Sequence, residues 1–169
     1  MTNLAQYKIE HLSGDSDKLG VCAKMMIASN PWNVLFFTEH QCFSDLSNSE
    51  LDVHGAANDK GEIVGFLAAM PHGIGFEPMI EYLCVREDMR GKGVGKALIK
   101  HFEETSFPDA DNLYLFVSDI NPEAIRLYVS LGYAQIGILP HFNLVGQTEF
   151  LHRKNRRPRQ ERAAKNRRG

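Results

Sequence analysis

A glycine-rich segment between a strand-like run and a helix-like run constrains this chain more than any other feature. Residues 90–96 read Arg-Gly-Lys-Gly-Val-Gly-Lys, so three alternate glycines are interleaved with three cations. Glycines lack a Cβ atom, which lets backbone N–H groups close around anionic oxygens, and the start of a helix adds further unpaired N–H groups. The segment therefore predicts a phosphate-binding turn that opens a helix, with Arg90, Lys92 and Lys96 adding positive charge.

The spacing excludes the two most common phosphate-binding loops. The dinucleotide pattern G-x-G-x-x-G fails because Lys96 occupies the position of the third glycine when the count starts at Gly91. A P-loop fails because Ala97 stands where a serine or threonine is required. A less common anion-binding pattern must therefore explain the glycines.

The remaining pattern, Arg90-x-x-Gly93-x-Gly95, resembles the acyl-coenzyme A binding signature Q/R-x-x-G-x-G/A of the GNAT N-acetyltransferase superfamily. A second segment, from Asn121 to Tyr133, reads Asn-Pro-Glu-Ala-Ile-Arg-Leu-Tyr-Val-Ser-Leu-Gly-Tyr. It is similar to the later N-x-x-A-x-x-L-Y-x-x-x-G-F/Y segment of the same family. Two matching segments in the right order make the resemblance specific.

The coarse pattern of hydrophobic periods and turn residues extends this resemblance to residues 7–152. It predicts strands over 7–12, 51–57, 62–70, 80–85, 113–117, 133–138 and 148–152, and helices over 15–26, 38–46, 97–105 and 122–131. The order β-α-α-β-β-β-α-β-α-β-β is that of the GNAT fold. The resemblance therefore implies an α+β fold, a central mixed and mostly antiparallel sheet flanked by about four helices. In the third helix we expect Glu103 to face solvent.

Charge is unevenly distributed along the chain. From Arg153 to position 169 there are nine Lys or Arg and one acidic residue, whereas residues 1–152 contain ten Lys or Arg and twenty Asp or Glu. We predict a folded domain over 1–153 and a flexible basic tail over 154–169. Three alternatives remain for the tail: no partner, weak contact with nucleic acid or an acidic protein, or docking on its own or a neighbouring subunit, which leaves a homodimer open.

Composition adds little beyond exclusions. The chain of 169 residues is 43% hydrophobic and 24% charged, as expected for one ordinary domain. No apolar run approaches the length of a membrane span, and the first thirty residues show no export signal, so we expect a cytoplasmic protein without membrane contact. Three widely spaced cysteines, without C-x-x-C or H-E-x-x-H, predict buried hydrophobic thiols and no metal site.

Acetyl transfer to an amine requires a base, because an alkylamine has a reference pKa of about 10 and must lose a proton before it attacks. Glu81 is the predicted base, on the strand that the resemblance places beside the pantetheine arm, where Glu81, Leu83 and Val85 should share one face. The alternatives are a water chain, or a solvent-facing carboxylate at Glu81. By resemblance, Tyr128 is the general acid for the leaving thiolate; otherwise it is a packed helix tyrosine.

The resemblance also implies which residues contact the cofactor. Asn121 has two compatible roles, as a helix N-cap and as a hydrogen-bonding group near the cofactor. The predicted cofactor contacts come from the strand before the loop, from the loop itself and from the start of the later helix: Leu83, Cys84, Val85, Arg90, Gly91, Lys92, Gly93, Val94, Gly95, Lys96 and Asn121.

The resemblance implies an acetyl-CoA-dependent N-acetyltransferase in which a primary amine attacks the thioester directly, with acetyl-CoA as cosubstrate and no metal. The acidic body suits a cationic acceptor, either a small amine or a lysine or N-terminal amine of a protein. The alternative is a non-catalytic acyl-CoA-binding or RNA-associated module that uses the basic tail. The presence of Glu81 and Tyr128 favours the enzyme.

Overall fold

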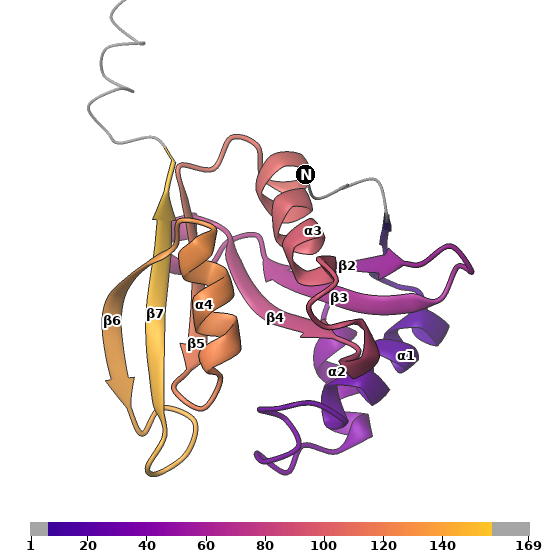
Figure 1. Ribbon diagram of the computed structural model, residues 1–169, viewed down its shortest axis with the longest axis horizontal. Helices are drawn as coiled ribbons and strands as arrows, with labels where there is room; N and C mark the ends of the chain where they lie inside the picture. Colours follow the sequence, from indigo (N-terminus) through magenta and orange to yellow (C-terminus); the bar gives the residue numbers. More distant parts are fainter. Residues whose placement is uncertain (1–6, 157–169) are drawn as a thin grey trace, which may run out of the picture.

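The computed structural model describes residues 7–156, which form one mixed seven-stranded sheet with helices on both faces (Figure 1). The strand order is β1-β2-β3-β4-β5-β7-β6, and every neighbouring pair is antiparallel except β4 and β5. The strands are β1 (Lys8–His11), β2 (Asp52–Ala57), β3 (Ile63–Met70), β4 (Met79–Val85), β5 (Asn112–Ser118), β6 (Ala134–Pro140) and β7 (Thr148–Asn155). The helices are α1 (Ser16–Ile27), α2 (Glu39–Leu46), α3 (Val94–His101) and α4 (Pro122–Ser130).

The predicted order of elements and the α+β class are confirmed, because local signals define most of the boundaries. Asp15 caps α1 by accepting a hydrogen bond from the Lys18 N–H at 3.1 Å. Thr38 and Gln41 form a reciprocal capping box at the start of α2. Gly132 follows α4 with φ of +90°, a conformation that few other residues adopt without strain.

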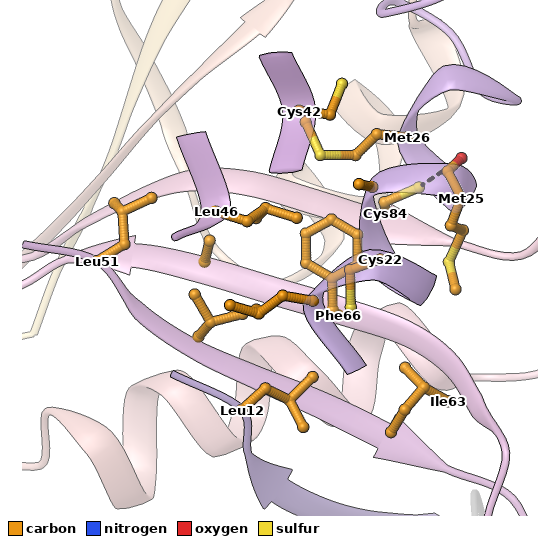
Figure 2. Close-up of a cluster of buried hydrophobic side chains, with 14 of the residues drawn as sticks. Leu12, Cys22, Met25, Met26, Cys42, Leu46, Leu51, Ile63, Phe66 and Cys84 are labelled. Atoms are coloured by element: carbon orange, nitrogen blue, oxygen red, sulfur yellow. Dashed lines mark hydrogen bonds between the residues drawn. The ribbon is translucent and has the colours of Figure 1, made fainter. Parts of the chain in front are cut away.

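One hydrophobic core lies between the sheet and the helices α1 and α2 (Figure 2). It contains all three cysteines, and Cys84 Sγ lies 3.6 Å from the Met25 carbonyl oxygen. Burial raises the pKa of the Cys22 thiol to about 12 and that of Cys84 to about 11. The prediction that the cysteines are buried is confirmed, and thiols with such pKa values are unreactive at neutral pH.

A second core lies on the opposite face, where α3 and α4 cover the centre of the sheet. Leu98 and Phe102 point into it together with Leu113, Leu115 and Tyr133. Among the described helices, none is both long enough and apolar enough to cross a bilayer.

The structure corrects the prediction for Glu103, which is buried rather than solvent-facing. The α-helical hydrogen bonds of α3 end at His101 and are followed by a π-helical turn, Phe102–Ser106. The wider turn rotates its side chains relative to an ideal α-helix and brings Glu103 Oε2 within 2.6 Å of Lys154 Nζ.

The predicted domain boundary also lies too early. Lys154 and Asn155 belong to β7, and the Arg156 guanidinium donates hydrogen bonds to the carbonyl oxygens of Glu103, Phe107 and Pro108. The folded part therefore continues through Arg156. The rest of the predicted tail, residues 157–169, lies outside the described residues.

Candidate active site

The strands β4 and β5 separate after a short contact, and this separation positions the candidate site (Figure 1). They pair only at Met79 with Tyr114 and at Ile80 with Leu115. After Ile80 the two strands diverge. Over residues 81–85, the edge of β4 that faces β5 therefore pairs with no other strand of the described residues.

The register of β4 on β3 shows which backbone groups face this gap. The Arg86 N–H donates to the Val64 carbonyl oxygen at 2.9 Å, and hydrogen-bonded pairs alternate along an antiparallel ladder. Cys84 and Phe66 therefore form a hydrogen-bonded pair, whereas the backbone N–H and C=O groups of Leu83 and Val85 point away from β3. Both residues are predicted cofactor contacts, on the strand that the resemblance places beside the pantetheine arm.

A β-bulge disturbs the register of β4 at Glu81. Tyr82 is opposite Ala68 and Ile80 is opposite Ala69, so Glu81 is the extra residue on β4. As a result Ile80 and Leu83, three residues apart, pack in the same hydrophobic core. The regular alternation expected through Glu81, Leu83 and Val85 is therefore interrupted at Glu81.

A groove of about 1110 Å³ runs from the gap along the glycine loop to α4. All predicted cofactor contacts line it. They are Leu83, Cys84, Val85, Arg90, Gly91, Lys92, Gly93, Val94, Gly95, Lys96 and Asn121. Cys84 contributes only its backbone to this wall, since its side chain is 3% exposed and points into the core on the other face.

The glycine loop presents backbone donors to the groove. Gly91 and Gly93 have φ of +71° and +90°, and Gly93 is the residue that caps α3. Within residues 7–156 no side chain caps this helix start, so the first N–H groups of α3 are left for an anion. Gly95 differs from these two glycines: a Cβ atom there would lie 3.4 Å from Leu127 Cδ2, an ordinary van der Waals contact, so the packing of α3 does not require a glycine at this position.

Arg90 stabilises the shape of the loop. Its Nε donates to the Val85 carbonyl oxygen at 3.3 Å, and its Nη2 donates to Ser29 Oγ at 3.1 Å. Ser29 lies just beyond the end of α1 and is buried. Arg90 therefore joins the loop to β4 and to the α1 side of the molecule, while Lys92 and Lys96 are exposed cations at the rim.

Asn121 has the predicted N-cap role, because its Oδ1 accepts a hydrogen bond from the Ala124 N–H at 3.2 Å. It also lines the groove and a second, smaller pocket of about 380 Å³. Five residues are common to the walls of both: Asn30, Trp32, Leu83, Asn121 and Ala124. The groove and the pocket therefore adjoin at the β4–β5 gap.

The smaller pocket contains both predicted catalytic residues, Glu81 and Tyr128. Although solvent still reaches Glu81, partial burial and then the negative charge of Asp45 raise the pKa of its carboxyl above the ordinary value. Tyr128 is 5% exposed, and burial raises the pKa of its hydroxyl. At neutral pH this hydroxyl keeps its proton and can donate a hydrogen bond.

The sequence patterns missed the far wall of this pocket. Glu149 on β7 is buried there, and its Oε1 accepts a hydrogen bond from Asn143 Nδ2 at 3.0 Å. Burial raises the pKa of this carboxyl, and the Asn143 hydrogen bond opposes the shift. The rings of Phe116 and Phe142 stack with centroids 5.5 Å apart. The sequence around Glu149, Thr-Glu-Phe-Leu, alternates polar and apolar residues as an ordinary strand does, so it does not indicate a site. Only the order of the strands in the sheet brings this carboxyl group into the same pocket as Glu81.

Known proteins resemble this chain in fold and, over part of its length, in sequence. The model of the acetyltransferase (GNAT) family matches residues 22–133. An uncharacterized protein of Mycobacterium leprae (strain TN) is 30% identical over 115 residues, which are 67% of this chain and 30% of that protein. Streptothricin acetyltransferase of Streptomyces lavendulae is 31% identical over 84 residues, which are 49% of this chain and 44% of that protein.

A solved structure of an aminoglycoside 6'-N-acetyltransferase, complexed with coenzyme A, superposes with a TM-score of 0.69. The match covers 89% of this chain and 98% of that one at 19% identity, so it establishes a shared fold. The two relatives matched by sequence are much longer than the matched region, since this chain spans less than half the length of each.

Proposed function

The chain belongs to the acetyltransferase (GNAT) family, and from this premise we propose that it transfers the acetyl group of acetyl-CoA to a primary amine. The observation that supports the proposal most strongly is that the groove and the smaller pocket adjoin. The groove that contains the glycine loop adjoins a pocket with two carboxyl groups and a buried tyrosine hydroxyl. A donor in the groove and an acceptor in the pocket would meet at the β4–β5 gap.

The cofactor is held mainly by backbone groups. The pyrophosphate lies against the N–H groups of the glycine loop and the start of α3, where the helix dipole favours negative charge. The amides of the pantetheine arm extend along β4 and pair with Leu83 and Val85, as an added strand would. This pairing brings the thioester to the gap, where a backbone N–H can stabilise the oxyanion that forms on the carbonyl oxygen.

The reaction begins when the neutral amine attacks the thioester carbonyl carbon. Glu81 accepts the proton that the amine loses, directly or through one water, and its raised pKa brings it closer to the pKa of its substrate. As the tetrahedral intermediate collapses, the C–N bond is kept, the C–S bond breaks and the thiolate leaves. Tyr128 donates a hydrogen bond to the sulfur as this charge develops.

The acceptor is a cationic amine. The pocket is in the size range of small-molecule sites, and it combines two carboxyl groups, Glu81 and Glu149, with the aromatic walls of Trp32, Phe116 and Phe142. A cation gains from the carboxylates and from the faces of the rings. A lysine side chain of a protein and a small polyamine share this chemistry, so both are acceptors to test.

Initial-rate kinetics test the proposal. Release of free coenzyme A should depend on an added amine, and double-reciprocal plots at several acetyl-CoA concentrations should intersect, because direct attack requires both substrates on the protein together. Parallel lines would indicate a covalent acetyl-enzyme instead. No amine-dependent release from a panel of small polyamines and lysine peptides would contradict the proposed function.

A further inference from the structure

Two histidines and an aspartate converge at the edge of the sheet that is remote from the acceptor pocket. His11 on β1 is directly opposite His54 on β2 in the register, and Asp52 precedes His54 by two residues. Residues two apart on a strand share one face, so all three side chains lie on the same face of the sheet. None of them lines the groove or the pocket of the candidate active site.

The three potential ligand atoms are close together. Asp52 Oδ1 lies 3.0 Å from His54 Nε2 and 3.2 Å from His11 Nε2, and all three atoms are within 4.8 Å of one another. In a tetrahedral zinc site with bonds of about 2.0–2.1 Å, neighbouring ligand atoms stand about 3.3 Å apart. A small side-chain adjustment would therefore exchange the two imidazole–carboxylate contacts for three bonds to an ion.

The surroundings support a preformed ligand set. The side chains of His54 and Asp52 are 15% and 26% exposed, while that of His11 is 57% exposed, which leaves an entry path for an ion.

A second layer of polar groups surrounds His54. The ring of His101, at the end of α3, has its centroid 4.7 Å from that of His54, and Ser106 Oγ lies 3.5 Å from His54 Nε2. Such groups around the ligands orient them and tune metal affinity.

We propose that His11, Asp52 and His54 form a binding site for a divalent transition-metal ion, with zinc as the best match. Two imidazoles and one carboxylate are the donors that zinc uses, whereas calcium and magnesium prefer oxygen ligands alone. With three protein ligands, the fourth position is left to water or to His101. The ion joins the four-residue edge strand β1 to β2, beside the end of α3 opposite to the glycine loop.

Calorimetric titration of the native, tag-free protein with Zn²⁺ tests the site. We expect saturable binding of one ion per chain, lowered by more than about 100-fold in the variants His54→Ala and Asp52→Asn, because each loses a direct ligand. His40→Ala is the matched control, since His40 is an exposed histidine on α2 that does not belong to this cluster, and it should bind Zn²⁺ as the wild type does. The cysteines do not compete, because all three are buried in the native state.

Nuclear magnetic resonance of the wild-type protein provides a readout that does not depend on the folding of a variant. On addition of Zn²⁺, the imidazole signals of His11 and His54 should change together, before those of His40 and His141. Absence of saturable binding, or binding that persists unchanged in both ligand variants, would show that the cluster is a hydrogen-bonded histidine–aspartate group only. Signal changes confined to other histidines would equally overturn the proposal.

Discussion

Gly93 illustrates how a single residue serves the cofactor groove. Its φ of +90° orients the peptide groups that begin α3, and an L-residue in this region costs about 1–2 kcal/mol. A larger residue would relieve that strain by rotating its N–H groups out of the groove. The sequence could predict a turn that opens a helix here because the requirement is local: a turn, a glycine and a helix start are adjacent in the chain.

We predict that Gly93→Ala weakens acetyl-CoA binding by more than about 10-fold, equivalent to about 1.4 kcal/mol. Gly61→Ala is the matched control, because Gly61 also has positive φ, +76°, and a Cβ atom there would meet nothing within 4 Å. The control has the same backbone strain in the β2–β3 turn, away from the groove. Calorimetric titration should show an unchanged affinity for acetyl-CoA in the control. Equal affinities for both variants would show that the glycine loop does not bind the pyrophosphate.

Glu81 gives a prediction for pH dependence. Its pKa is raised above the ordinary value of about 4.3, and the base acts only when it is ionised, so kcat should fall as pH drops through the raised pKa. Glu81→Gln should lower kcat and flatten this acidic limb. Glu149→Gln should instead raise the KM of a cationic amine and retain the limb. If only Glu149→Gln removes the limb, then Glu149 is the base.

Tyr128→Phe removes one hydroxyl and keeps the ring. We expect kcat to fall by about 10²-fold with acetyl-CoA affinity retained, because the lost hydrogen bond acts on the leaving sulfur. Tyr133→Phe is the control: its buried ring packs edge-on against Tyr128 with centroids 5.9 Å apart, but it lines neither the groove nor the pocket. Steady-state kinetics of both variants measure the difference, and wild-type turnover in Tyr128→Phe would remove the proposed role.

At the scale of the elements, the strands were harder to predict than the helices. Three helices begin at the caps Asp15, Thr38 and Asn121, and each cap is a local feature because it accepts from N–H groups a few residues away. The bulge at Glu81 had no such signal, since it arises from the register between β4 and β3. The extent of β7 was also missed: its last residues are basic and resemble a solvated tail until Glu103 is found beside Lys154.

The Lys154–Glu103 contact tests this corrected boundary. Lys154→Ala leaves the buried Glu103 without its cation, and removing one partner of a buried pair costs about 3–5 kcal/mol. Because Lys154 is 25% exposed, we expect a smaller loss of unfolding free energy, about 2 kcal/mol. Lys100→Ala, which breaks the solvent-exposed pair with Glu104 at 3.7 Å, should cost less than about 0.5 kcal/mol.

Denaturant titration of the two lysine variants provides the comparison. Equal stabilities would mean that Lys154 contributes no more than a surface residue, and that the fold does not depend on residues beyond the predicted boundary at 153.

Across the whole molecule, the sequence predicted the residues of the groove far better than those of the pocket. The predicted groove residues come from two compact segments, each of which has its own pattern. The acceptor pocket is assembled from the segment after α1, from β4, β5, α4 and β7, and from the β6–β7 connection. The histidine cluster has the same origin, because His11 and Asp52 are brought together only when β1 pairs with β2.

The proposed acetyl transfer requires that the groove and the pocket meet at the β4–β5 gap. A crystal structure of the protein with bound coenzyme A tests this most directly. We predict the pyrophosphate on the N–H groups of residues 91–96, the pantetheine amides paired with Leu83 and Val85, and the sulfur within hydrogen-bonding reach of the Tyr128 hydroxyl. A cofactor bound outside the groove, or a sulfur that does not reach the pocket containing Glu81 and Tyr128, would contradict the account.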